Sequence, residues 1–255
     1  MDYLQAIFLG IVQGLTEWLP ISSSGHLVII QELFGINVPL IFDIMLHLGT
    51  LLAVFAMFWK DLLKILASIV HLDFKSEYGK LAAFLVVGSI PVALVGALFH
   101  DFFASLFSNL TAVGVALLIT GIILYSSKFH NESKQLNYKE SFLVGIAQAI
   151  AIIPGISRSG FTIATGLLRG VDRREIFRFS FLLSIPAIIG ATVFELTTVP
   201  LAGFDLMDMT LGTLTAAVVG YLSLKLLLRL VVNRKFYLFS FYCLGLGLLI
   251  LSISL

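Results

Sequence analysis

Charged residues are scarce in this chain. Lys, Arg, Asp and Glu make up 12% of its 255 residues, whereas hydrophobic residues make up 59%, and the mean hydropathy is +1.04. A soluble globule of this length could not cover its surface with so few polar side chains. The sequence therefore predicts an integral membrane protein and excludes a water-soluble one.

Other absences narrow the class further. The single cysteine, Cys243, lies in a late apolar run, where we expect a small core or lipid-facing residue that does not report a redox compartment. No basic run with interleaved aromatics occurs, so we expect no nucleic acid partner. The N-terminus has no basic region and carries Glu17 where a cleavable signal has small residues, so we expect no removable targeting peptide. No soluble domain or long linker interrupts the chain, which indicates a single integral membrane domain over 1–255.

Long apolar runs are what the sequence has in place of charge. Runs of about twenty residues indicate spanning helices rather than the short alternating strands of a barrel. Six are long enough: about 39–59, 80–99, 109–127, 179–199, 210–228 and 236–255. Lys and Arg gather in the connections 60–80, 128–139, 169–178 and 229–235. The connections 100–108 and 200–208 contain no Lys or Arg, and their acidic residues are Asp101, Asp205 and Asp208. The positive-inside rule places the first four connections in the cytoplasm and the last two outside.

Two polar stretches, 13–26 and 148–162, interrupt the apolar sequence and are versions of one another. Seven residues recur after a shift of 135 positions, and most of them are polar or glycine rather than generic Leu and Val. They are Gly10, Ile11, Gln13, Ile21, Ser22, Ser24 and Gly25, which fall on Gly145, Ile146, Gln148, Ile156, Ser157, Ser159 and Gly160. The chain therefore contains an internal duplication, with repeat one over 1–127 and repeat two over 136–255.

The loop assignment makes the two repeats run in opposite directions. Segment 140–168 lies between two cytoplasmic connections, so it must enter the membrane, turn and leave on the same side. Both polar stretches contain a Pro and Gly/Ser break between two helical arms, at 20–25 and 154–160. The fold class predicted is an all-α membrane protein with an inverted-topology repeat, each copy one re-entrant hairpin plus three transmembrane helices. Such breaks meet around one polar pocket in many transporters.

The first break, or first tip, carries an acid, hydroxyls and an imidazole. Gln13 and Glu17 are four residues apart and share a helix face. A carboxylate inside a membrane segment is costly, so Glu17 marks a candidate site for a divalent cation or a proton. The three serines Ser22, Ser23 and Ser24 follow, and His26 has the spacing to reach a hydroxyl on the same turn, as a base reaches a nucleophile.

The second break, or second tip, supplies a cation. Arg158 is its basic residue, and a guanidinium is suited to phosphate oxygens. The hydroxyls of Ser157, Ser159 and Thr162, and a helix starting near Gly160, add hydrogen-bond donors for an anion. Together the two tips predict a phosphate or diphosphate site within the membrane.

Structural explanations stand beside this one. Serines and glycines such as Ser24, Ser159 and Gly25 often serve only close helix packing. Glu17 and Arg158 alternatively form a structural ion pair that joins the repeats, and His26 alternatively bonds a backbone carbonyl. Asp43 and His47 are interpreted as structural, and Glu195 and the Arg169–Arg178 cluster as interfacial. A transporter or lipid flippase is the rival function, because an inverted repeat suits alternating access.

The two tips resemble the undecaprenyl-diphosphate phosphatase family associated with bacitracin resistance. The family's first signature, Glu or Gln followed four residues later by Glu, is matched by Gln13 and Glu17 and is followed by Ser-Ser-Ser-Gly-His at 22–26. Its second signature, Pro-Gly-x-Ser-Arg-Ser-x-x-Thr, is matched in full at 154–162. The similarity extends over nearly the whole chain.

The resemblance implies hydrolysis of undecaprenyl diphosphate to the monophosphate and inorganic phosphate, which recycles the lipid carrier of cell-wall glycans. It also implies dependence on a divalent cation, Mg²⁺ or Ca²⁺, and a plasma-membrane site open to the outer face. A homo-oligomer is compatible with it. Carried over by residue, the catalytic set is Glu17, Ser23, His26 and Arg158, the substrate-binding set is Gln13, Ser22, Ser157, Ser159 and Thr162, and Glu17 is the metal ligand. Position 13 is Gln where the family also uses Glu, so a metal site here has one fewer charge.

These residues lead to a mechanistic hypothesis. Arg158 and the hydroxyls of the second tip bind the diphosphate, a cation near Glu17 neutralises charge, and Ser23, activated by His26, attacks the terminal phosphorus. Attack by water or by His26 itself stays open.

Overall fold

The computed structural model describes residues 3–34, 38, 40–99, 102–103, 106, 109–129, 134–197 and 205–254. Within these ranges the chain forms ten α-helices and two short 3-10 turns, and no β-strand. The helices are α1 (Tyr3–Trp18), α2 (Ser23–Phe34), α3 (Leu40–Val70), α4 (Glu77–Leu98), α6 (Leu110–Ser126), α7 (Tyr138–Ile150), α8 (Arg158–Leu168), α9 (Arg173–Leu196), α10 (Leu206–Val232) and α11 (Phe239–Ser254).

Six of these helices, α3, α4, α6, α9, α10 and α11, are long and apolar enough to cross a membrane. They correspond to the six predicted apolar runs, which confirms a helical, multi-pass membrane protein. The predicted run 39–59 was too short for α3, because this helix continues past Lys60 and Lys64 to Val70. Charged side chains end an apolar run without ending a helix, because Lys is a good helix former.

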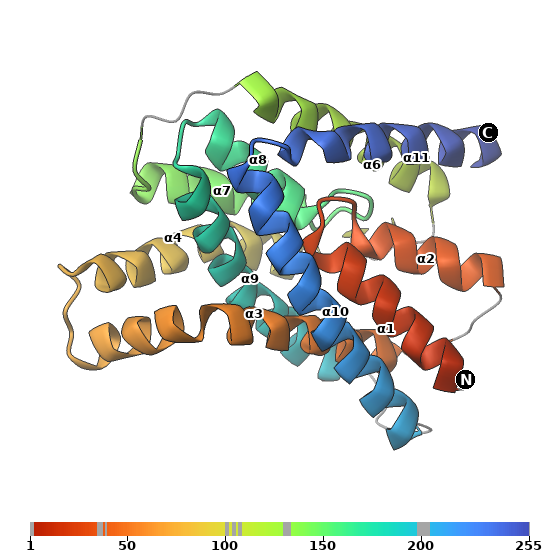
Figure 1. The fold of residues 1–255 in the computed structure, drawn as a ribbon, viewed down its shortest axis with the longest axis horizontal. Helices are drawn as coiled ribbons and strands as arrows, with labels where there is room; N and C mark the ends of the chain where they lie inside the picture. The colour runs from red at the N-terminus through yellow and green to blue at the C-terminus, as the bar shows by residue number, and fades with distance from the viewer. Residues whose placement is uncertain are drawn as a thin grey trace.

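Pairs of helices from distant parts of the chain pack side by side. Helix α6 lies along α11, α1 along α10, and α4 along α7, while α3 also packs on α10. In Figure 1 α6 and α11 run together along one edge, and α1 and α10 cross the middle of the bundle. The start of α1 and the end of α11 lie at the same end of the molecule (Figure 1). The two halves of the chain are therefore intertwined rather than placed next to each other.

Aromatic side chains form the centre of the largest buried cluster. Phe177 and Phe181 of α9 pack with ring centroids 4.5 Å apart, and Phe58, at the kink of α3, lies 6.4 Å from Phe181. Trp18, at the end of α1, meets Phe181 edge-to-face at 5.3 Å. These four side chains are buried. They make a rigid floor beneath the end of α1, where the candidate acid Glu17 lies.

The polar connections carry defined ion pairs. Arg178 bonds Asp61 at 2.7 Å and Glu77 at 2.9 Å, which ties α9 to α3 and α4. Arg169 holds Glu140 through two hydrogen bonds of 2.8 and 3.0 Å. The bond from Arg169 lowers the pKa of the Glu140 carboxyl below its ordinary value. The interpretation of the Arg169–Arg178 cluster as purely interfacial was therefore incomplete, because Arg169 and Arg178 bind specific acids.

Some predictions concern residues that the structure does not describe. Asp101 lies outside the described residues, as does part of the connection between the proposed repeats. The boundaries 1–127 and 136–255 stay predictions.

Candidate active site

The first tip is a break of four residues between α1 and α2. Glu17 lies on the buried side of α1 near its end, with Gln13 one turn before it. After Pro20 the chain reaches Ser22, whose φ of 68° lies in the left-handed region that residues other than glycine seldom adopt. The Ser22 hydroxyl accepts a bond from the Gly25 amide at 3.4 Å, and α2 begins at Ser23. The break thus directs the first residue of α2 back toward the end of α1.

The second tip is built on the same plan between α7 and α8. Ser157 caps α8 by accepting from the Gly160 amide at 3.2 Å. The Thr120 hydroxyl of α6 donates to the Gly155 carbonyl at 3.1 Å and accepts from the Ser157 amide at 3.3 Å. Gly155 has a φ of 93°, and a Cβ there would lie 2.5 Å from the Val113 carbonyl oxygen. Only glycine fits this position, and the turn it allows makes Arg158 the first residue of α8.

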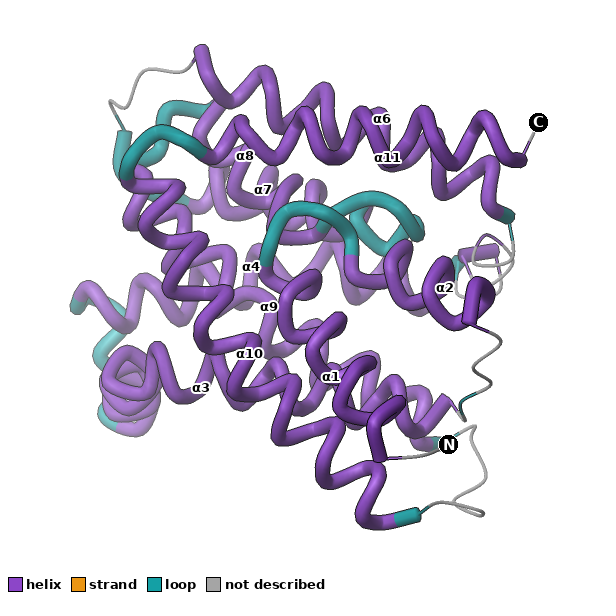
Figure 2. The backbone as a smooth tube through the Cα atoms, turned by 45° about the vertical axis from the view of Figure 1, so that its right-hand side comes forward, coloured by secondary structure: helices purple, strands orange, loops and turns teal. Residues whose placement is uncertain are grey.

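The two tips meet inside the bundle, where the teal breaks of Figure 2 lie close to each other. A Cβ on Gly160 would lie 3.3 Å from Pro20. The Glu17 carboxylate is the centre of the contact. Its Oε1 binds Nη2 of Arg158, and its Oε2 accepts from Ser23 at 2.7 Å and from Gln13 at 3.1 Å. The structure therefore brings together four of the predicted site residues around one buried acid.

Trp18 holds the arginine in place from below. The Arg158 guanidinium carbon lies 5.1 Å from the centre of the Trp18 ring, at cation–π distance. Because Trp18 is itself packed on the aromatic floor, the guanidinium is fixed in two directions, by a ring face and by a carboxylate. Sequence reasoning missed this role, although Trp18 is the neighbour of Glu17.

His26 does not bond Ser23, the arrangement that the spacing predicted. Its Nδ1 lies 2.7 Å from the Ser22 carbonyl oxygen and its Nε2 lies 2.6 Å from the Tyr242 hydroxyl. The alternative expectation, a bond from His26 to a carbonyl, is the one confirmed. Ser23 instead donates to Glu17, so the carboxylate rather than the imidazole lies next to the candidate nucleophile.

The remaining predicted hydroxyls support the two tips. Ser22 and Ser24 lie 3.3 Å apart, and so do Ser157 and Ser159. Thr162 is fully buried, and its hydroxyl donates to the Arg158 carbonyl at 2.8 Å and lies 2.6 Å from the Ser180 hydroxyl. These contacts hold the start of α8 in position. A direct bond from these groups to an anion stays a prediction.

His47, which the sequence analysis interpreted as structural, lies next to the candidate site. Its Nε2 lies 3.6 Å from Glu17 Oε2, and its Nδ1 bonds the Asp43 carbonyl oxygen at 2.8 Å. The Asp43 carboxylate in turn accepts from Gln31 at 3.0 Å. The sequence did contain one signal for this position. Asp43 and His47 are four residues apart, so on a helix the imidazole can bond the carbonyl of the preceding turn, which fixes its orientation. A half-exposed imidazole therefore borders the buried acid.

The oxygen atoms around Glu17 include types that a hard divalent cation binds. Carboxylate, amide and hydroxyl oxygens of Glu17, Gln13 and Ser23 are the ligand type that Mg²⁺ and Ca²⁺ prefer. The Gln13 Oε1 atom is buried and has no hydrogen-bond partner among the described residues. The described part of the chain holds no cluster of three or more His, Cys, Asp or Glu that would make a complete metal cage. Phosphate oxygens of a substrate would have to complete the coordination.

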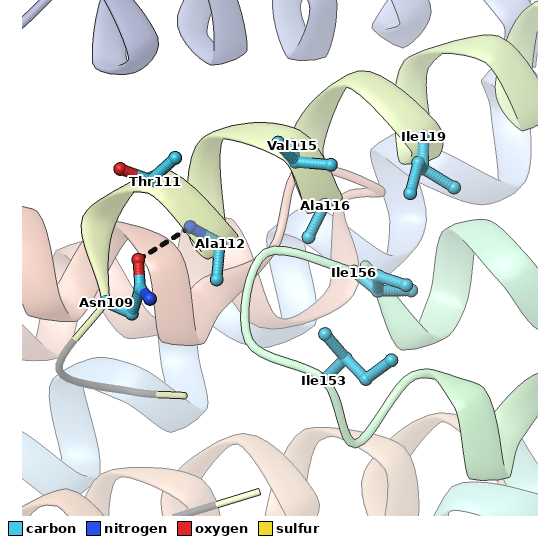
Figure 3. Close-up of a pocket in the computed structure, with 8 residues that line it drawn as sticks. All are labelled: Asn109, Thr111, Ala112, Val115, Ala116, Ile119, Ile153 and Ile156. Carbon is cyan, nitrogen blue, oxygen red and sulfur yellow. Dashed lines mark hydrogen bonds between the residues drawn. The ribbon is translucent and has the colours of Figure 1, made fainter. Parts of the chain in front are cut away.

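Two surface grooves lie away from these contacts. One of about 380 Å³ runs between α6 and the second break and is lined mainly by apolar side chains, among them Val115, Ile119, Ile153 and Ile156 (Figure 3). A second, of about 400 Å³, lies between α6, α7 and α8. None of the predicted catalytic residues lines either groove. The site is thus defined by its buried polar contacts and not by either groove.

The fold and site define a polytopic helical membrane protein with an acid, an arginine and a serine joined across two helix breaks. The family described as Bacitracin resistance protein BacA matches residues 6–249, and the chain belongs to it.

Relatives are similar over their full length. The chain is 45% identical to an undecaprenyl-diphosphatase of Halothermothrix orenii, with 100% of this chain and 99% of that protein covered. It is 39% identical to an undecaprenyl-diphosphatase of Methanosphaera stadtmanae, with the same coverage. It is 40% identical to undecaprenyl-diphosphatase 3 of Bacillus cereus, with 100% and 98% covered.

Proposed function

We propose that this membrane protein hydrolyses undecaprenyl diphosphate to undecaprenyl monophosphate and inorganic phosphate. The observation that carries the proposal is that the Glu17 carboxylate binds both Arg158 and Ser23. An anion-binding group, a proton acceptor and a hydroxyl nucleophile then lie within one phosphate's reach. Full-length relatives bearing the name undecaprenyl-diphosphatase support the same substrate and reaction. The product would return to the lipid carrier pool used for cell-wall glycans.

Arg158 would bind the diphosphate. A guanidinium donates in a planar fork that matches phosphate oxygens, and the ring of Trp18 supports one of its faces. The start of α8, capped by Ser157, adds backbone N–H groups at the same point. The apolar prenyl chain stays in the lipid, which sends only the diphosphate toward the two tips.

Ser23 would be the nucleophile and Glu17 its base. The Ser23 Oγ attacks the terminal phosphorus, its proton passes to Glu17, and the bridging P–O bond breaks, which releases the prenyl monophosphate. Water then attacks the phosphoserine and releases inorganic phosphate, and Ser23 regains a proton. This differs from the predicted pairing of Ser23 with His26, because the Ser23 hydroxyl donates to Glu17 at 2.7 Å.

A divalent cation, Mg²⁺ or Ca²⁺, would be held by Glu17 and Gln13 together with the substrate. When bound it would neutralise the charge that develops on the transferred phosphoryl group.

The finer fold proposed is an inverted repeat with two re-entrant hairpins. Both tips share one capping pattern, at Ser22 and at Ser157. The equivalent glycines of the repeats also make equivalent contacts. A Cβ on Gly10 would lie 2.6 Å from the Gly212 carbonyl oxygen, and one on Gly145 would lie 2.2 Å from that of Gly88. In each case the first arm of one half packs on a spanning helix of the other.

The location proposed is the plasma membrane, with the site open to the outer face. The support is the distribution of charge among the connections between helices. The positive-inside rule places the connections that are rich in Lys and Arg in the cytoplasm, and the two that lack them outside. A lipid diphosphate released on the outer face by glycan transfer would then be the natural substrate.

The experiment is phosphate release from a prenyl diphosphate by purified protein in detergent, where no second compartment exists. Wild type should release phosphate in a cation-dependent manner. Ser23→Ala should lose activity by at least about 100-fold, whereas Ser24→Ala, a matched change at a hydroxyl that contacts only Ser22 among the hydrogen bonds described, should retain most of it. Rapid quenching should trap phosphate on Ser23. Binding of the lipid without release would instead indicate a transporter.

A further inference from the structure

The His26 imidazole is held by two hydrogen bonds that together fix its tautomer. A carbonyl oxygen can only accept, so Nδ1, at 2.7 Å from the Ser22 carbonyl, carries a hydrogen. In the neutral ring Nε2 is then the acceptor, and the Tyr242 hydroxyl at 2.6 Å is the donor. The two rings are also stacked, with centroids 5.7 Å apart and planes 13° apart.

Tyr242 reaches His26 from the far end of the sequence. It lies in the first turn of α11, 216 residues from His26. The next residue, Cys243, bonds the Pro20 carbonyl oxygen in the first break at 3.3 Å. Two successive residues of α11 therefore contact the first tip. Cys243 bonds the backbone of Pro20, and Tyr242 bonds the imidazole of His26. Packing of α11 along α6 fixes this helix independently of the tip.

We infer that Tyr242 is a positioning residue for His26. Its hydroxyl keeps Nε2 of the imidazole an acceptor and keeps the ring in one orientation at the edge of the site. The inference rests on the proposed function for its catalytic consequence: the family resemblance places His26 in the catalytic set, at the edge of the pair formed by Ser23 and Glu17. The tautomer itself depends only on the two bonds.

The location of Tyr242 separates this role from simple packing. Its side chain is 47% exposed, so it contributes little to the core. A tyrosine that only filled space would be replaced by phenylalanine without consequence, because the ring contact with His26 would persist. A tyrosine that acts through its hydroxyl would not.

The test compares Tyr242→Phe with Tyr125→Phe. Tyr125 is a matched control, because it is a partly exposed tyrosine of the neighbouring helix α6 that packs on Phe241. Tyr242→Phe should lower kcat by about tenfold, the equivalent of one hydrogen bond, with KM changed less than about twofold. Tyr125→Phe should change neither.

Nitrogen NMR of ¹⁵N-histidine-labelled protein gives a readout that does not depend on activity. The wild type should show one His26 tautomer with a hydrogen on Nδ1, identified by loss of its signals in His26→Gln. In Tyr242→Phe the Nε2 signal should move to the position of an acceptor without a donor. Unchanged His26 signals in Tyr242→Phe would overturn the inference, and so would a kcat equal to that of wild type. Absence of phosphate release by the wild type would instead contradict the proposed function. The positioning of His26 by Tyr242 would then be tested by the NMR comparison alone.

Discussion

The ion pair between Glu17 and Arg158 offers the sharpest test, because it separates a catalytic contact from a structural one. The perturbation is Glu17→Gln, which keeps the size of the side chain and removes its charge. Arg158→Met is the complementary single variant, and the third protein carries both changes. A structural pair and a catalytic pair respond differently to this cycle.

The magnitude follows from burial and from the number of contacts. Glu17 is buried and its carboxylate binds Arg158, Ser23 and Gln13. Breaking a buried ion pair from one side costs about 3–5 kcal/mol, because the remaining charge is left unpaired. The Arg158 side chain is 17% exposed, so water reaches part of it and we expect a cost of about 3 kcal/mol. The double variant has no unpaired charge and should recover much of that loss.

Activity should not recover with stability. Loss of a general base lowers the rate by about 100- to 10,000-fold, and loss of the anion-binding arginine removes substrate binding as well. Unfolding by denaturant in detergent micelles measures the first quantity, and phosphate release from a prenyl diphosphate measures the second. Asp61→Asn is the control, because it breaks an ion pair with Arg178 that involves none of the predicted site residues, and it should leave kcat unchanged.

One outcome would refute the reasoning. If the double variant recovers both its stability and a rate within about tenfold of wild type, the pair is a structural tie between the two halves of the chain and the proposed roles of Glu17 and Arg158 are wrong.

Three further predictions concern the turn, the cation and pH. Gly155→Ala should destabilise the protein by about 1–3 kcal/mol and lower activity, since its φ of 93° disfavours alanine; Gly245→Ala, with no atom within 4 Å of the added Cβ, is the control, and thermal unfolding measures both. Gln13→Glu should lower the Mg²⁺ concentration needed for half-maximal phosphate release, because it adds a second carboxylate; an unchanged or raised concentration would argue against a cation beside position 13. Since Arg169 lowers the pKa of Glu140, the stabilisation from this pair is complete above the ordinary value of 4.5 and lost as pH falls below it. Melting temperatures should therefore decline from about pH 5 to pH 3 in the wild type and decline less in Glu140→Gln.

Much of the fold and of the site was accessible from sequence, because both depend on local patterns. Apolar runs of bilayer length predicted the six spans, and the duplicated tips predicted that Glu17, Ser23 and Arg158 lie close together. The contact between Glu17 and Arg158 follows from the argument that two breaks in a membrane must cover each other.

The pairing within the first tip was not accessible in the same way. Ser23 starts α2, so its side chain faces back to the end of α1, whereas His26 lies almost one turn further along the helix. At that position the imidazole reaches the carbonyl oxygen of Ser22, four residues before it. Its second partner, Tyr242, is set by the packing of α11, for which the sequence carries no local signal. Spacing along a helix shows which groups share a face, and long-range packing decides which of them bond.

The contact between Glu17 and Arg158 also has a consequence for the order of events in the proposed reaction. While the guanidinium binds the carboxylate, one Glu17 oxygen is occupied by this contact. A diphosphate carries more charge than one carboxylate and competes for the same guanidinium donors. Binding of the substrate to Arg158 would therefore free Glu17 to accept the proton of Ser23, with which it already shares a hydrogen bond. In this arrangement the nucleophile becomes activated when a diphosphate is present to be attacked, and the serine stays unreactive while the two tips are paired with each other.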